Sequence, residues 1–92
     1  MPYTVHKFPL DLTDEQCICV PGFIKPLSVE VQKGKPVLYV LVEPTAYSVQ
    51  MAVRVAGTGH PIHSPWQPGH FVGTFQLHGG DLVFHVFAKS GL

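Results

Sequence analysis

The residues with the clearest potential for chemistry form a glycine-rich segment in the second half of the chain. Gly57, Thr58, Gly59 and His60 combine two flexible residues with a hydroxyl and an imidazole. Glycines leave backbone N–H groups open to form a nest for an anion, to which the threonine hydroxyl could add a hydrogen bond. The segment lacks the spacing of a Walker loop and the following helix that a dinucleotide-binding fingerprint needs. It predicts a phosphate-binding turn, and the alternative is a strand end that needs positive φ angles.

Four further side chains could contact a ligand held there. Arg54, the only arginine, lies three residues before the glycines and could add a bidentate phosphate contact, with Lys35 as a second cation. Trp66, the only tryptophan, could stack on a base or anchor a neighbouring subunit, and Gln76 could read a base edge. The alternatives are an ordinary solvated arginine and a tryptophan that covers the protein's own core.

The histidines allow several interpretations. His60 and His78, each beside a glycine, are the better candidates for ligand contacts. They leave open a phosphoesterase in which one histidine is the general base and the other the acid. Because no spacing of a known structural zinc site is present, we expect no metal at His60, His63, His70, His78 and His85. His85 lies in an apolar segment, which predicts a partly buried, hydrogen-bonded histidine.

Other catalytic groups are scarce. No serine lies in a nucleophile elbow, no paired carboxylates stand out, and neither cysteine has an evident basic neighbour. Cys17 and Cys19 would point to the same face of a strand, where they fail disulfide geometry. The sequence predicts that both are buried, reduced and packed as small hydrophobic residues, and that the protein is no enzyme and needs no cofactor.

The elements that position these residues are expected to be strands. Residues 47–55 alternate between apolar and polar side chains and form the clearest strand, while Lys33 and Gly34 predict a tight turn within a hairpin. Strands are expected at residues 3–8, 15–20, 27–32, 36–42, 47–55, 70–77 and 82–87. Seven short strands joined by turns predict an all-β fold, a small antiparallel barrel or sandwich, as a single domain over residues 1–92.

The segments between these strands are short, with one exception. Nine prolines and nine glycines fall at intervals along the 92 residues and leave no window for a long helix. A short helical turn is expected over residues 12–16, capped by Thr13, and a frayed tail over residues 89–92. Residues 57–69 form a loop that is long for so small a domain, and such loops are often functional.

Composition limits the partners. Only 13% of the residues are charged, against about 25% in a typical domain, which indicates surface covered in a homo-oligomer. Equal numbers of acidic and basic residues give zero formal charge, so a nucleic acid polymer is not expected as a partner. The chain has no apolar run near the 18 residues of a membrane helix. We therefore expect a cytoplasmic protein with no membrane contact.

Several groups of residues together resemble a family of very short proteins encoded by bacteriophages and prophages. The resemblance spans nearly the whole chain and rests on residues 7–10, 13–16, 32–36, 57–62, 71–76 and 82–87. Its most specific parts are residues 57–62 and 82–87. Family members often carry acidic residues after position 62, where this chain has His63, Ser64 and Pro65.

The resemblance implies a biological setting, phage infection, rather than a mechanism, because the family has no settled activity. Some small, β-rich, oligomeric phage proteins act as sponges for nucleotide signals that bacterial immune systems make after infection. By analogy, we expect a non-catalytic protein that sequesters such a signal, of the cyclic-dinucleotide type, in the infected host's cytoplasm. The predicted contacts are Arg54, Gly57, Thr58, Gly59, His60, Trp66, Gln76 and His78. The alternative is a protein-binding or structural phage accessory protein, followed by the phosphoesterase.

Overall fold

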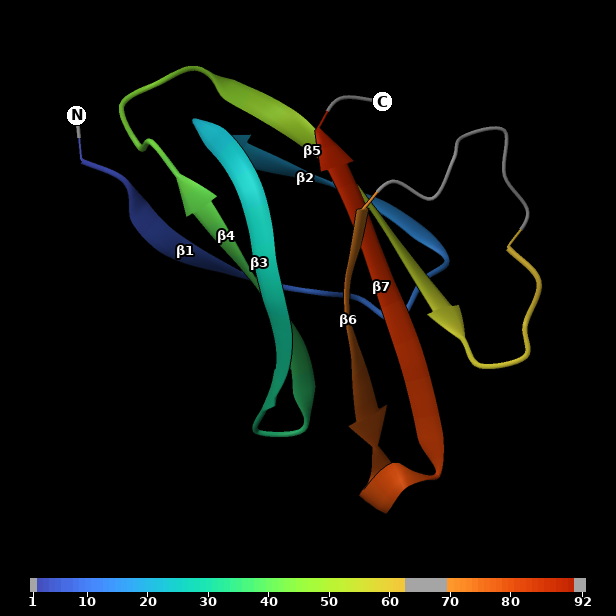
Figure 1. Ribbon diagram of the computed structural model, residues 1–92. Helices are drawn as coiled ribbons and strands as arrows, with labels where there is room; N and C mark the ends of the chain where they lie inside the picture. The colour runs from blue at the N-terminus through green and yellow to red at the C-terminus, as the bar shows by residue number, and fades with distance from the viewer. Residues whose placement is uncertain (1, 63–69, 91–92) are drawn as a thin grey trace.

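The computed structural model describes residues 2–62 and 70–90 and consists of strands joined by short connections (Figure 1). The elements are β1 (Thr4–Pro9), β2 (Glu15–Pro21), β3 (Phe23–Gln32), β4 (Lys35–Val42), β5 (Ser48–Gly57), β6 (His70–Leu77), the 3₁₀ turn η1 (His78–Gly80) and β7 (Leu82–Ser90). All seven predicted strands are present, with ends shifted by a few residues. The prediction of an all-β fold is confirmed.

The strands form two antiparallel sheets that make a sandwich rather than a closed barrel. One sheet has the order β1-β4-β3 and the other the order β2-β5-β7-β6. β4, which is apolar along nearly its whole length, is therefore the middle strand of its sheet, while β5 and β7 are the inner strands of the second sheet (Figure 1). β2 and β6 form the edges of that second sheet.

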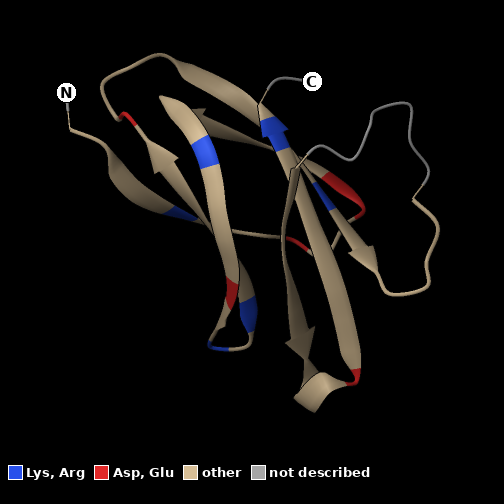
Figure 2. Cartoon of the chain, viewed as in Figure 1, with Lys and Arg blue, Asp and Glu red and all other residues tan. Residues whose placement is uncertain are grey.

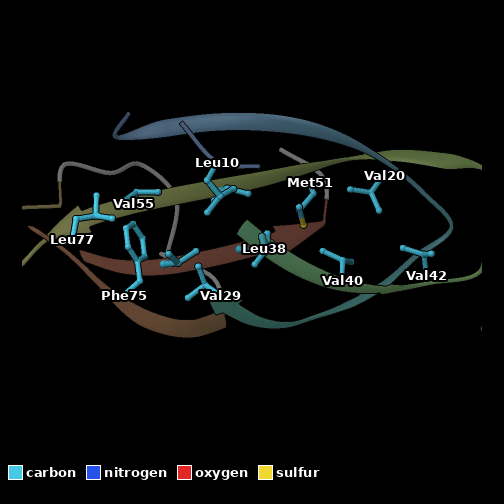
Figure 3. Packing of buried hydrophobic residues seen from close by; sticks show 13 residues of the cluster. Leu10, Val20, Val29, Leu38, Val40, Val42, Met51, Val55, Phe75 and Leu77 are labelled. Carbon is cyan, nitrogen blue, oxygen red and sulfur yellow. The ribbon is translucent and has the colours of Figure 1, made fainter. Parts of the chain in front are cut away.

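The core lies between the two sheets, where alternate residues of each strand meet. Leu38 and Val40 of β4 and Met51 and Val53 of β5 belong to one cluster with Val86 of β7 (Figure 3). Each lies on an inner strand with its side chain removed from solvent. Burying one such side chain contributes about 1.5–3 kcal/mol, so this alternation drives the two sheets together.

One glycine allows the chain to pass from one sheet to the other. Gly22 separates β2 from β3 and has a φ of 51°, in the left-handed region. Its N–H donates to the carbonyl oxygen of Tyr47, and its own carbonyl accepts from the N–H of Glu43. A Cβ atom at Gly22 would lie 1.7 Å from the carbonyl oxygen of Glu43, so a side chain cannot fit at this crossing.

Local details both confirm and correct the expectations. Lys33 and Gly34 have φ angles of 51° and 79°, which confirms the tight turn between β3 and β4. The expected helical turn over residues 12–16 is wrong, because β2 already begins within it and Gln16 Nε2 donates to the Asp11 carbonyl at 2.8 Å. The expected fraying of residues 89–92 is also wrong for its first half, since β7 continues to Ser90.

The two cysteines correct another expectation. Cys17 and Cys19 share one face of β2, as predicted, and they are free thiols. Both are exposed rather than buried, because Ile18 between them pairs with the core residue Met51 and turns the cysteines to the outer face. The larger aliphatic side chain takes the core position, and the thiols are left in solvent.

Charged residues are scattered over both sheets and the connections between strands in the described part of the chain (Figure 2). Arg54 is the only charged side chain that is buried among the described residues. No helix within residues 2–62 and 70–90 has the length and apolar character needed to cross a membrane.

Candidate functional site

The glycine-rich segment continues from the end of β5 as a tight turn formed by residues 57–60, called the 57–60 turn below. Gly57 pairs with Phe84 of β7, and the Thr58 N–H extends the ladder by donating to the Val83 carbonyl at 3.1 Å. The His60 N–H donates to the Gly57 carbonyl at 3.0 Å. The first of these bonds occupies the Thr58 N–H, one of the donors predicted for the anion nest, so that group is not open to a phosphate.

Two surface depressions lie on either side of the 57–60 turn. The first has a volume of about 200 Å³ and is lined by Asp14, Glu15, Arg54, Val55, Ala56, Gly57, His60, Pro61 and Ile62. The second has a volume of about 240 Å³ and is lined by Gly57, Thr58, His60, Asp81, Leu82, Val83 and Phe84. Gly57 and His60 line both. The turn is therefore a wall shared by two adjoining hollows.

His60 lies directly against Gly57 within this wall. A Cβ atom at Gly57 would come within 2.8 Å of the His60 Nδ1 atom. The absence of a side chain at Gly57 therefore gives the imidazole its place between the two depressions. Gly59, with a φ of 83°, lets the chain reverse so that His60 can fold back.

Arg54 lines the first depression as one half of an ion pair. Its Nη2 donates to the Oε1 of Glu15, which lies directly opposite on β2. Arg54 is only 3% exposed, whereas the side chain of Glu15 is 56% exposed. The alternative interpretation of Arg54 as an ordinary solvated residue is wrong, because Arg54 lies on an inner strand beside Phe87. Glu15 already offers its carboxylate to this guanidinium, so a phosphate would compete with Glu15 for it.

The charge of the first depression favours hydrogen-bond donors over anions. Asp14 and Glu15 contribute two carboxylates and Arg54 one guanidinium, which gives a formal charge of −1 when His60 is neutral. Carboxylate oxygens accept from N–H groups and hydroxyls. A base edge or a sugar hydroxyl suits this hollow better than a phosphate does.

A chain of three polar side chains crosses the outer face of the same sheet. The Nε2 of His85 lies 2.6 Å from the Thr58 hydroxyl, and its Nδ1 lies 2.9 Å from the Thr74 hydroxyl. The side chain of His85 is half-buried. Together with the two hydrogen bonds, this confirms the prediction of a partly buried, hydrogen-bonded histidine. Since a neutral imidazole donates from one nitrogen and accepts at the other, one threonine accepts from His85 and the other donates to it.

Sequence reasoning missed Thr74 because nothing local connects it to the glycine-rich segment. Thr74 pairs with His85 across β6 and β7. The period-two pattern places Thr74 on one face with Gln76, but only the register of the strands brings Thr74 opposite His85. No signal in a single sequence specifies that register.

The remaining predicted contacts are dispersed. Gln76 pairs with Val83, whose carbonyl accepts from the Thr58 N–H, so Thr58, Val83 and Gln76 lie in one row. His78 lies in η1 and lines neither depression, and Lys35 lies at the start of β4 in the other sheet. Trp66 and His63 lie outside the described residues.

Side chains that could together bind a metal ion through three or more ligands do not cluster in the described part of the chain. No group of three or more His, Cys, Asp and Glu side chains is placed to hold a metal ion within residues 2–62 and 70–90. His85 contacts two threonine hydroxyls through its ring nitrogens, so both nitrogens are already engaged by the protein.

The fold and the site define a class: a small antiparallel β-sandwich with paired depressions at one end of its larger sheet. Residues 1–91 match the family described as a domain of unknown function, DUF7352, and the chain belongs to this family. Comparison with curated proteins and with solved structures gives no match.

Proposed function

We propose that this protein binds a small nucleotide-derived signal around the 57–60 turn and holds it without changing it chemically. The proposed ligand is a cyclic dinucleotide, and the proposed role is to sequester this signal during phage infection. The resemblance to short phage-encoded proteins supports the setting, and the low charged fraction of 13% supports assembly into a homo-oligomer.

The observation that carries the proposal is the pair of similar depressions that share one wall. Each hollow, at about 200 and 240 Å³, is smaller than the usual ligand pocket of about 300–1,000 Å³, whereas together they fall within that range. A ligand built from two similar halves would fill both hollows across the shared Gly57 and His60. Cyclic dinucleotides have this two-part shape.

The lining residues support contacts to bases and sugars rather than to phosphates. Asp14 and Glu15 in one hollow and Asp81 in the other offer carboxylates to base N–H groups and ribose hydroxyls. His60 can stack against a base, and its neutral form adds little salt dependence. In this arrangement Arg54 fixes the position of Glu15, and the phosphates face solvent beside the turn.

The test is to mix the purified protein with a panel of cyclic and linear nucleotides, remove unbound ligand, heat-denature the complex and identify what is released. Intact nucleotide would support the proposal. Altered nucleotide would replace it with an enzyme, and retention of nothing across the panel would overturn it.

Variants locate the binding within the molecule. His60→Ala and Thr58→Val should reduce retention at least about tenfold, the effect of losing one contact of about 1.4 kcal/mol. His6→Ala and Thr4→Val on β1 are matched controls in the other sheet and should retain ligand as the unmodified chain does. Equal losses in both pairs would contradict the assignment of the site.

The second candidate is a protein-binding role, favoured by exposed aromatic side chains. Tyr47 is 94% exposed, and Phe71 is 59% exposed while its ring packs edge-on against Phe87. Such residues are typical anchors at protein interfaces. Phe71→Ser should weaken self-association in size-exclusion chromatography with light scattering. If Phe71→Ser abolishes association and the unmodified chain retains no nucleotide, the protein-binding role replaces the proposed one.

A further inference from the structure

The outer face of β2 carries two thiols that the nucleotide site does not use. Cys17 and Cys19 are exposed, lie on an edge strand and point the same way. Their partners on β5 are Ala52 and Gln50, neither of which competes strongly for a thiol. Thus both sulfur atoms are open to a ligand from solvent.

The spacing of the two cysteines is too wide for a disulfide between them but suits a metal ion that bridges both sulfur atoms. Alternate residues of a strand lie about 6.6 Å apart, whereas a disulfide needs Cβ atoms about 3.5–4.5 Å apart. Two thiolate–metal bonds in line, each about 2.3 Å as for zinc, span about 4.6 Å, so each sulfur need lean only about 1 Å toward the other. A cation between the sulfurs therefore fits where a direct S–S bond does not.

The number of protein ligands at this site indicates which metal ion it can bind. No third His, Cys, Asp or Glu completes a cluster with the two thiols in the described residues. Structural zinc takes four ligands, whereas soft thiolates also select Cu(I), which is stable with two. Ala52 pairs with both Cys17 and Lys89, so the ammonium of Lys89 adds positive charge to the face that carries the thiolates.

We propose that Cys17 and Cys19 together form a two-thiolate site for a soft monovalent cation of the Cu(I) type. Binding releases one proton from each thiol and leaves a two-coordinate complex with a net charge of −1, and no electron is transferred. The site is independent of the nucleotide proposal, because it lies outside both depressions.

The test is a titration of the full chain with Cu(I) under anaerobic, reducing conditions against a coloured competing chelator. We expect one Cu(I) per chain. Because two linked donors bind at least about 100-fold more tightly than one, Cys17→Ser and Cys19→Ser should each lower the affinity by about that factor.

A variant with two displaced thiols controls for thiol number. Cys19→Ser combined with Ser48→Cys keeps two exposed thiols on the same face, because Ser48 pairs with Pro21. These two thiols lie about 13 Å apart along the strands, too far for one cation to bridge. This variant should bind as weakly as the single variants, while its thermal unfolding confirms that it is folded.

Two results would overturn the proposal. The first is an unmodified chain that binds Cu(I) no more tightly than the single variants do, which would mean that the two thiols act separately. The second is a stoichiometry of one Cu(I) per two chains together with dimerisation in light scattering, which would place the metal site at an interface between two copies of the chain.

Discussion

The ion pair between Arg54 and Glu15 gives the sharpest test of how this sheet holds a buried charge. Glu15→Gln keeps the size of the side chain and one hydrogen-bond acceptor but removes the negative charge opposite Arg54. Losing one partner of a fully buried pair costs about 3–5 kcal/mol, and an exposed pair contributes about 0.2–1 kcal/mol. Arg54 is 3% exposed and the Glu15 side chain 56% exposed, so an intermediate loss of about 1–2 kcal/mol is expected.

The loss should appear in both chemical and thermal unfolding. For a domain of this size 1 kcal/mol lowers the Tm by about 4–8 °C, so Glu15→Gln should lower it by about 5–15 °C. The urea midpoint should fall with an unchanged m-value, since the unfolded chain is little affected. Glu30→Gln, which changes an exposed carboxylate on β3, is the control and should stay within about 0.5 kcal/mol.

A double-mutant cycle separates the pair from its surroundings. Arg54→Met, Glu15→Gln and their combination should give a coupling free energy of about 1 kcal/mol. A coupling near zero, or a Glu15→Gln variant as stable as Glu30→Gln, would refute the argument that Glu15 compensates the charge of Arg54.

Three further changes test the fold and the site. Gly22→Ala should cost more than about 4 kcal/mol in unfolding free energy, because its Cβ meets backbone, whereas Gly34→Ala, with nothing within 4 Å, should cost about 1 kcal/mol; equal losses would contradict the crossing geometry. Leu38→Ala should cost about 2.5–5 kcal/mol in urea unfolding, since this side chain is fully buried in the core, and a loss below 1 kcal/mol would place it elsewhere. Thr74→Val should cost about 0.5–1.5 kcal/mol and shift the NMR signals of the His85 ring, and unchanged signals would argue against that hydrogen bond.

The sequence by itself determined the class of fold and the positions of the strands. The period of two over residues 47–55 and the apolar run over residues 36–42 reflect local geometry, because successive side chains of a strand point to opposite faces. Lys33 and Gly34 specify their turn through their own φ angles. Such features depend on neighbours in the chain and can be read without the fold.

Only the tertiary structure decided which face of each strand is buried and which strands meet. Cys17 and Cys19 alternate with Ile18 as predicted, yet the core took the isoleucine and exposed both thiols. Arg54 lies on the face away from the core and is still buried, because it lies on an inner strand, opposite Glu15 on one side and Phe87 on the other.

The candidate site depended on strand register even more strongly. Thr58 directly follows β5, Thr74 lies within β6 and His85 lies within β7. Hydrogen bonds join these three residues only because β5 and β6 both pair with β7. A shift of one residue in either pairing would turn His85 or its partners to the opposite face. Local pattern specifies the period of a strand, whereas the packing of the whole sandwich selects the register that places these three side chains together.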